Sequence, residues 1–127
     1  IVVSIDVKKF PDGTYHVMKN FGKEDTSMGV IEWAKKVEDA GAGEIFLTSI
    51  DADGALKGYD INLIKSVVQA VKIPVIASGG VGDWKHLVEG IAEGGAAAVS
   101  VGNKFHFTEH STMHAKKYLK AHGIDVR

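Results

Sequence analysis

The sequence predicts an α/β fold in which parallel strands alternate with covering helices. Two observations support this prediction: short apolar runs of strand length recur along the chain, and each is followed by a polar loop and a segment with helical spacing of apolar residues. A length of 127 residues with 45% hydrophobic content is sufficient for one domain with a buried core. The expected strand–helix units cover approximately residues 1–41, 44–72, 73–95 and 97–123.

The first unit opens with the apolar run Ile1–Val7, which is expected to form a buried strand that brings Asp6 to its end. Residues 8–28 form a long connection, in which Thr14–Met18 can pair back onto the strand as a small hairpin. Gly29–Ala40 then shows apolar residues on one helical face and charged residues on the other. The connection over residues 8–28 is long, and connections of this length are usually functional or mobile.

The second and fourth units have the same order of elements. Glu44–Ile50 is the second expected strand, and Asp60–Val71 is the amphipathic helix that follows it. The hydroxyl and carboxyl side chains at the end of this strand are Thr48, Ser49, Asp51 and Asp53. In the fourth unit a short strand over Ala97–Val101 ends at Gly102-Asn103, and the last helix runs to about Ala121.

The third unit contains the stretch Ile73–Asp83, which reads IPVIASGGVGD. Its apolar strand ends at residues that let the backbone turn and leave amide N–H groups uncovered, namely Ser78, Gly79 and Gly80. Asp83 can cap the helix that follows. Bare N–H groups and the positive end of a helix dipole then meet at one point, which suits a phosphate. The alternative is that the two glycines only form a tight strand-to-helix turn.

Polar residues are thus expected at the carboxyl ends of all the strands, as the active-site face of a TIM (β/α)8 barrel requires. An open doubly wound sheet is the alternative, but the dinucleotide-binding fingerprint is missing after the first strand. We therefore predict that the chain is half of a (β/α)8 barrel. The residues expected on one rim are Asp6, Thr48, Ser49, Asp51, Asp53, Ser78, Gly79, Gly80, Gly102 and Asn103.

The rim residues suggest two kinds of chemistry. The loops after the last two strands of a barrel often hold phosphate, and here they contain Ser78-Gly79-Gly80 and Gly102-Asn103. Asp6 lies where a general acid or base would lie, near other carboxylates that could raise its pKa. The alternative for this carboxylate is a structural role, in hydrogen bonds to N–H groups of the loops.

Other functional classes receive little support. A net charge of −1 without a basic tract gives no reason to expect a nucleic-acid or membrane partner, and the absence of cysteine excludes disulfides and thiolate sites. The stripe His106, His110 and His114 lacks the Glu of a zinc protease motif and is expected to be solvated. Asp51 and Asp53 resemble the start of a calcium loop, but position twelve of that loop is not Glu. We expect no metal or cofactor.

Several motifs, taken in their order along the chain, resemble those of a known family. Asp6 after an apolar strand, followed in order by GAGEIFLTSIDADG, KGYD, IPVIASGGVGD and FHF, resembles the C-terminal half of the cyclase subunit of imidazole glycerol phosphate synthase. The resemblance covers essentially all 127 residues and implies the fifth to eighth βα units of a barrel. It also implies a cytoplasmic lyase of histidine biosynthesis. Such an enzyme takes ammonia from a glutaminase subunit and converts a phosphorylated formimino ribonucleotide into imidazole glycerol phosphate and an aminoimidazole carboxamide ribonucleotide.

The resemblance also implies roles for single residues. Asp6 matches one of two catalytic aspartates, and Glu44 matches a charged gate where ammonia enters. The positions that match substrate and phosphate binding are Thr48, Asp53, Ser78, Gly79, Gly80, Gly102 and Asn103. The other catalytic aspartate and the second phosphate site belong to the N-terminal half of the barrel, which would be a further partner. Because the first residue is Ile1, already within a strand-like run, we expect a piece of a longer chain.

Several positions depart from the pattern of the family. Ala55 replaces a Thr, Ser27 replaces a Gly, and Gly102-Asn103 replaces Ala-Ser. These changes leave open a paralogue that is paired with a glutaminase and amidates a surface-polysaccharide sugar. A non-catalytic half barrel is a further alternative, because four strands alone cannot close a barrel. We expect the isolated chain to be inactive or to associate through its sheet edges.

Overall fold

The computed structural model describes residues 1–102 and 111–127, which form an α/β fold with a six-stranded, mostly parallel sheet. The described elements are β1 (Val2–Lys9), β2 (Tyr15–Lys19), β3 (Glu24–Gly29), α1 (Val30–Asp39), β4 (Glu44–Ser49), α2 (Ile61–Ala70), β5 (Val75–Ser78), α3 (Trp84–Ala92), β6 (Ala98–Val99) and α4 (Ser111–Ala121). The predictions made for Asn103, His106 and His110 lie outside the described residues.

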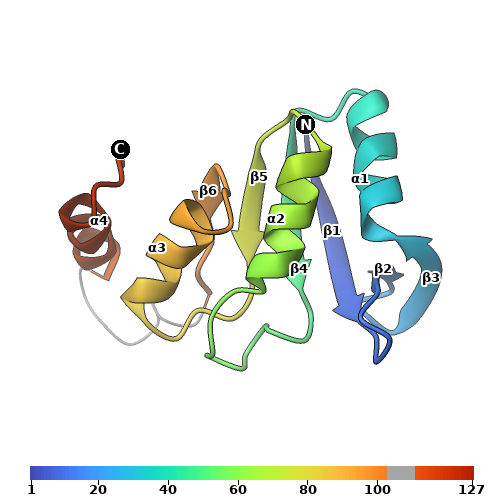
Figure 1. Ribbon diagram of the computed structural model, residues 1–127, viewed down its shortest axis with the longest axis horizontal. Helices are drawn as coiled ribbons and strands as arrows, with labels where there is room; N and C mark the ends of the chain where they lie inside the picture. The colour runs from blue at the N-terminus through green and yellow to red at the C-terminus, as the bar shows by residue number, and fades with distance from the viewer. Residues whose placement is uncertain (103–110) are drawn as a thin grey trace.

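The strands lie side by side in the order β3-β2-β1-β4-β5-β6 (Figure 1). Neighbours from β1 through β4 and β5 to β6 run parallel, whereas β2 and β3 form an antiparallel hairpin on the other side of β1. The pairing expected for Thr14–Met18 is confirmed, because Tyr15 pairs with Lys9 and Met18 with Asp6. The sheet is compatible with part of a (β/α)8 barrel.

Strand β3 was not predicted from the sequence, which placed most of its residues in the long connection over residues 8–28. Glu24–Gly29 pairs only with β2 at the edge of the sheet, and all its residues are exposed or half-buried. An exposed edge strand needs no alternation of apolar and polar residues, so the sequence gives no periodic signal for it. The hairpin β2–β3 therefore accounts for most of the long connection.

Helices α1, α2 and α3 lie side by side along the sheet, and α4 lies beyond α3 (Figure 1). The ranges expected for the first two helices are confirmed to within one residue at each end: α1 runs over 30–39 and α2 over 61–70. Strand residues buried in the common core are Ile5, Val7, Ile45, Leu47, Val75 and Ala77. Since successive side chains of a strand point to opposite faces, these residues define the face that packs on the helices.

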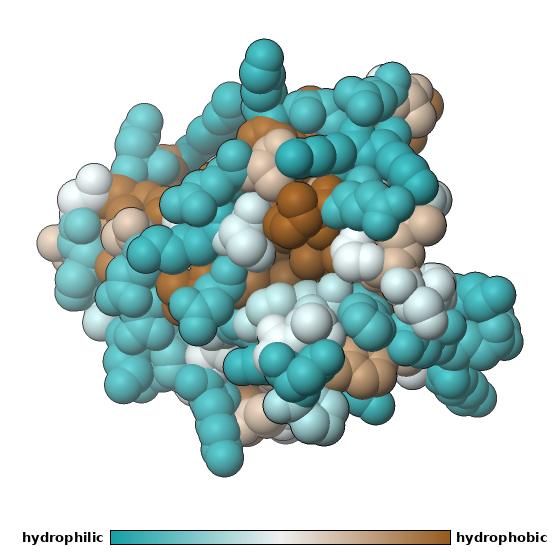
Figure 2. Space-filling view, turned by 45° about the vertical axis from the view of Figure 1, so that its right-hand side comes forward, coloured by the Kyte–Doolittle hydropathy of each residue, from teal (hydrophilic) through white to brown (hydrophobic). Residues whose placement is uncertain are grey.

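The opposite face of the sheet carries the alternate residues. These residues are exposed or half-buried: Ser4, Asp6, Phe46, Thr48, Ile76 and Ser78. The face in Figure 2 is largely hydrophilic, with apolar side chains emerging between hydrophilic ones. The large apolar side chains that are exposed are Ile1, Val2, Phe21, Leu56 and Met113. Among the described residues, no helix has both the length and the apolarity needed to cross a membrane.

Strand β6 is shorter than the expected Ala97–Val101. Only Ala98 and Val99 pair with β5 in strand register, although the N–H of Ala97 donates to Val75 and that of Ser100 to Ala77. In the described part of the chain, β6 pairs with β5 alone and forms that edge of the sheet. Its carboxyl end is therefore held by few ladder hydrogen bonds.

Candidate functional site

The candidate site begins with a row of polar side chains across adjacent strands. The strand register places Asp6 of β1 beside Thr48 of β4, and Thr48 beside Ser78 of β5. These residues belong to the open face of the sheet and lie near the carboxyl ends of their strands. The sequence predicted that they share a rim, and the register brings all of them together.

Asp6 has a second neighbour that the sequence analysis missed. On its other side lies Met18 of β2, its partner in the antiparallel register. Met18 is buried, whereas Asp6 is half-buried. In the strand register Asp6 is therefore flanked by one apolar residue, Met18, and one hydroxyl residue, Thr48. Only the pairing of β1 with β2 reveals this neighbour, and nothing in the local sequence of the hairpin indicates it.

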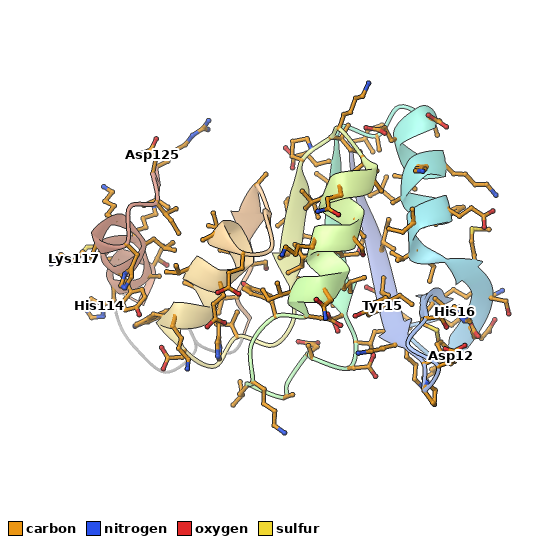
Figure 3. All side chains as sticks on the ribbon, viewed as in Figure 1. Asp12, Tyr15, His16, His114, Lys117 and Asp125 are labelled. Atoms are coloured by element: carbon orange, nitrogen blue, oxygen red, sulfur yellow. The ribbon has the colours of Figure 1, made fainter. Side chains whose placement is uncertain are left out.

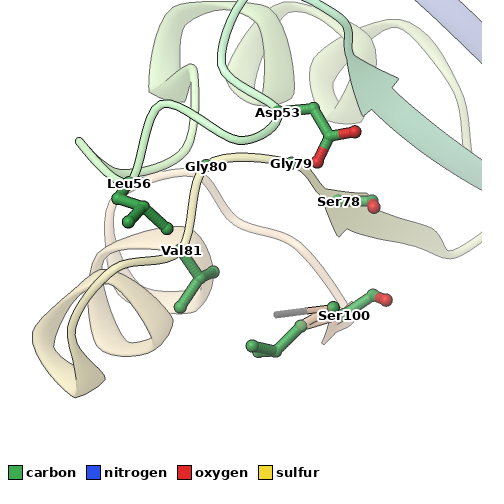
Figure 4. A pocket seen from close by; sticks show the side chains of 9 residues that line it. Asp53, Leu56, Ser78, Gly79, Gly80, Val81 and Ser100 are labelled. Atoms are coloured by element: carbon green, nitrogen blue, oxygen red, sulfur yellow. The ribbon is translucent and has the colours of Figure 1, made fainter. Parts of the chain in front are cut away.

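A small pocket continues the row beyond β5. Its volume is about 110 Å³, well below the roughly 300 Å³ or more typical of sites for whole small molecules, so it fits a single group of a ligand. The predicted site residues that line it are Asp53, Ser78, Gly79, Gly80 and Gly102 (Figure 4). The prediction that these residues meet at one place is thus consistent with the fold. Asp6 and Thr48 do not line this pocket.

The glycine turn that forms one wall of the pocket needs glycine for two separate reasons. Gly79 and Gly80 have φ angles of +94° and +112°, a region that other residues rarely adopt. A Cβ on Gly80 would also lie 2.0 Å from the carbonyl oxygen of Gly58, and one on Gly79 would lie 2.8 Å from that of Ser49. Close approach of two backbone segments therefore shapes the pocket wall.

The helix α3 that follows does not offer the bare N-terminus that the sequence analysis expected. Asp83 is the cap, as predicted, and its carboxylate accepts from the N–H of Lys85. In addition, Nδ1 of His86 accepts from the N–H groups of Gly82 and Asp83. The helix thus satisfies these donors with its own side chains. Any anion in the pocket would have to be held by the glycine turn instead.

The loop between β4 and α2 is fixed at several points. The carboxylate of Asp51 accepts from the N–H of Lys9 at 2.7 Å. Asp60 caps α2 through Leu63 and accepts from the hydroxyl of Tyr15 at 3.1 Å. These contacts hold the loop that carries Asp53 against the end of β1.

Ser49 does not face the rim, contrary to the expectation. It is buried on the helix side of β4, and its Oγ accepts from the N–H of Ala52. The alternation of side chains along a strand separates it from Thr48. Its role in this structure is to shape the loop.

Two tyrosines beside the site donate hydrogen bonds through hydroxyls whose pKa values are raised. Burial, followed by the hydrogen bond to the Asp60 carboxylate, raises the pKa of Tyr15 to about 12. Burial raises the pKa of Tyr59 even further above its ordinary value, and its hydroxyl donates to the carbonyl of Ser100 at 2.8 Å. Both phenols therefore keep their protons at neutral pH.

The charge of the pocket restricts how it could bind an anion. None of the described residues that line it is cationic, and Asp53 contributes a negative side chain. Backbone N–H groups and the hydroxyls of Ser78 and Ser100 are therefore the donors available for a phosphoryl group. The described residues also contain no cluster of His, Asp and Glu side chains that could hold a metal ion. His114, the described member of the histidine stripe, is exposed on α4 at the far end of the molecule (Figure 3).

Glu44 lies at the opposite end of the sheet from the row of polar residues. It begins β4, is half-buried, and lines a groove with Pro74 and the C-terminal residues Asp125 and Arg127. Thr48 lies four positions further along β4, about 13 Å away at roughly 3.3 Å per residue. This position agrees with the expected end of the sheet, and its role as a gate stays a prediction.

The fold and the site together define a class of protein. A parallel sheet covered by helices, with polar side chains and a glycine turn at the carboxyl ends of its strands, is the arrangement of barrel-type α/β enzymes. The family model described as histidine biosynthesis protein matches residues 1–111. The chain therefore belongs to the histidine biosynthesis protein family, whose members are biosynthetic barrel enzymes.

Proposed function

We propose that residues 1–127 are the C-terminal half of a (β/α)8-barrel cyclase of histidine biosynthesis. The enzyme would use ammonia to form imidazole glycerol phosphate and an aminoimidazole carboxamide ribonucleotide. The observation that carries this proposal is the row of Asp6, Thr48 and Ser78, which leads directly into the pocket lined by Gly80 and Gly102. In this proposal the carboxylate is catalytic and the glycine turn binds an anion, and both lie near the carboxyl ends of their strands. Family membership supports the pathway.

In this proposal the pocket holds a phosphoryl group of the ribonucleotide substrate. The pocket has the size of one such group, and the turn through Gly79 and Gly80 can direct backbone N–H groups at it. Asp53 would accept hydrogen bonds from hydroxyl groups of the ligand, because its carboxylate would repel the phosphate itself. The ligand would then extend from the pocket along the row of polar residues.

Asp6 would act at the other end of the ligand as general acid or base. Neighbouring strands are about 4.8 Å apart, so β1 and β5 are separated by about 10 Å across β4. A ribonucleotide anchored by its phosphate spans this distance. Ring closure to an imidazole requires proton transfers, and Asp6, which is paired in register with Met18 and Thr48, would carry them.

The proposal also includes partners. Ammonia would come from a glutaminase subunit and enter at the end of the sheet where Glu44 lies. The N-terminal half of the barrel would supply the second catalytic aspartate and cover the open face of the sheet. We further propose that the enzyme works in the cytoplasm, where the rest of such a pathway would be found.

The main test is the substitution Asp6→Asn, assayed with ammonia and the formimino ribonucleotide in the presence of the N-terminal half of a cyclase barrel. Loss of a general acid or base should lower turnover by about 10²–10⁴-fold. Binding of imidazole glycerol phosphate should stay within a few-fold of the unmodified chain, because the pocket is untouched. Turnover that survives the substitution would show that Asp6 is structural.

A matched assay tests whether the chain needs the other half. We expect the chain alone to show no cyclase activity, because the open face and the sheet edges lack the rest of the barrel. Activity should appear only when the N-terminal half is added. Light scattering that shows a stable monomer with full activity would contradict the half-barrel proposal.

A second candidate function is amidation of a surface-polysaccharide sugar by a related glutaminase-coupled enzyme. The observation that favours it is Ala55, which occupies the loop next to Leu56, a residue that lines the pocket. A Thr hydroxyl at this position, as in the cyclase family, is absent here. If ammonia-dependent turnover of the formimino ribonucleotide is not detected with both halves present, this second candidate is favoured.

A further inference from the structure

Tyr59 is a buried residue beside the pocket that neither catalysis nor ligand contact explains. It is 7% exposed, and its hydroxyl donates to the carbonyl of Ser100 at 2.8 Å. Its ring packs so closely on α3 that a Cβ on Gly90 would lie 2.9 Å from it. The tyrosine therefore ties the end of β6 to a rigid part of the core.

The residue before Tyr59 ties down the other wall of the same pocket. The N–H of Gly58 donates to the carbonyl of Gly80 at 2.7 Å, a short bond between two segments in close contact. Consecutive residues thus hold both walls: Gly58 holds the glycine turn after β5, and Tyr59 holds the end of β6. Figure 4 shows the two walls, with Gly80 on one and Ser100 on the other.

The wall formed by the end of β6 has fewer other contacts than the wall after β5, so it depends more on its hydrogen bond, the one from Tyr59. Strand β5 pairs on both sides, with β4 and β6, whereas β6 has only two residues in strand register and pairs with β5 alone among the described elements. Ser100 lies just beyond that short pairing, where its N–H donates to Ala77. The Tyr59 hydroxyl is the side-chain contact that fixes its carbonyl.

We propose that Tyr59 is a positioning residue that sets the width of the anion pocket between the glycine turn and the end of β6. This inference rests on the proposed function, because it takes the pocket to be a phosphate site. The N–H groups of two separate turns can converge on one phosphoryl group only when the distance between the turns is fixed. The hydroxyl of Tyr59 fixes it without touching the ligand.

The test compares two variants that each remove one hydroxyl. Tyr59→Phe removes the hydroxyl that donates to the carbonyl of Ser100 and keeps the ring, whereas the control Thr26→Val removes a hydroxyl that donates to the carbonyl of Val17 within the hairpin. Inorganic phosphate is titrated into each protein by calorimetry. We expect Tyr59→Phe to weaken phosphate binding by about tenfold, because the lost hydrogen bond holds a wall of the pocket. Thr26→Val should leave phosphate binding within twofold, because its lost hydrogen bond lies in the hairpin and not at the pocket.

Hydrogen exchange separates positioning from a purely structural role. Saturating phosphate should slow amide exchange at both Gly80 and Gly102 in the unmodified chain, but only at Gly80 in Tyr59→Phe. If Tyr59→Phe lowers the urea midpoint while phosphate affinity and the exchange pattern stay unchanged, the residue is structural and the inference is wrong. If the unmodified chain itself does not bind phosphate, the proposed function fails, and the positioning role fails with it.

Discussion

Two regions flank the candidate site, and they are held together by different kinds of interaction. On one side, the loop at Gly58 packs against the glycine turn at Gly80 by direct backbone contact, and the buried His86 completes the packing. On the other side, the hairpin β2–β3 is held by the ladder of β1 and by exposed side chains (Figure 3). Both regions border the same end of the sheet.

The hairpin region contains a series of exposed polar contacts. Asp12 accepts from the hydroxyl of Thr14 at 2.6 Å, Thr14 lies 3.3 Å from Nε2 of His16, and Nδ1 of His16 lies 3.1 Å from Asp25. Water competes for each of these groups, so each contact contributes little to stability. In the buried region water cannot replace a lost partner, and a clash cannot be relieved. We therefore expect the two regions to respond differently to equivalent substitutions.

The largest effect is expected when a methyl group is added to each region. Gly80→Ala puts a Cβ 2.0 Å from the carbonyl oxygen of Gly58 at a φ of +112°, whereas Gly13→Ala, at a φ of +86°, has no atom within 4 Å of its Cβ. Gly13→Ala should lower the free energy of unfolding by about 1–2 kcal/mol, which is the cost of holding an alanine at a positive φ. Gly80→Ala adds overpacking and should lose about 3 kcal/mol or more from the free energy of unfolding. Urea unfolding followed by circular dichroism measures both, and equal losses would contradict the comparison.

An intermediate effect is expected when a histidine is removed from each region. His86→Ala takes the Nδ1 acceptor from the N–H groups of Gly82 and Asp83 in a buried setting and should lower the free energy of unfolding by about 2 kcal/mol. His16→Ala breaks exposed contacts with Asp25 and Thr14 and should cost less than about 1 kcal/mol. Thermal unfolding at pH 7 compares the two variants. A larger loss of unfolding free energy for His16→Ala than for His86→Ala would contradict the expectation that the buried region tolerates substitution less well than the hairpin.

The smallest effect concerns acid. Hydrogen bonds from the N–H of Ser27 and from His16 hold the pKa of Asp25 below its ordinary value. A carboxyl with a lowered folded-state pKa adds stability above its unfolded pKa of about 3.9, and this stability is lost as the pH falls through the folded pKa. Asp25→Asn should therefore be less stable than the unmodified chain at pH 7, and this difference should shrink toward pH 3. Urea midpoints at both pH values measure the difference, and a gap of constant size would show that the lowered pKa does not contribute.

Local sequence was enough to predict most of the regular elements. Apolar residues at helical spacing predicted α1 and α2, and Asp83 was recognised as a cap from its side chain alone. The cap that Asp60 forms on α2 was not predicted. The same reasoning failed for β3, because an exposed edge strand has no apolar face. It also placed Ser49 on the rim, because the direction of side chains depends on where the strand alternation starts.

The candidate site shows the same division. The sequence singled out candidate site residues, among them Asp6, Asp53 and Gly80, because they follow apolar runs that were expected to be strands. It could not indicate Met18 or Tyr59, which reach the site through strand pairing and through a hydrogen bond to Ser100. Nor could it show that His86 already satisfies the N–H groups at the start of α3.

By itself, then, the sequence determined the alternation of parallel strands and helices and the chemical types present at the strand ends, because periodicity and residue type are properties of short segments. The tertiary structure decided which of those residues meet, since the register of β1, β4 and β5 places Asp6, Thr48 and Ser78 in one row. It also decided the shape of one pocket wall, where Gly58 and Gly80 are in close contact although they lie far apart in the chain. Contacts between distant segments form only when the whole core packs, and no local pattern records them.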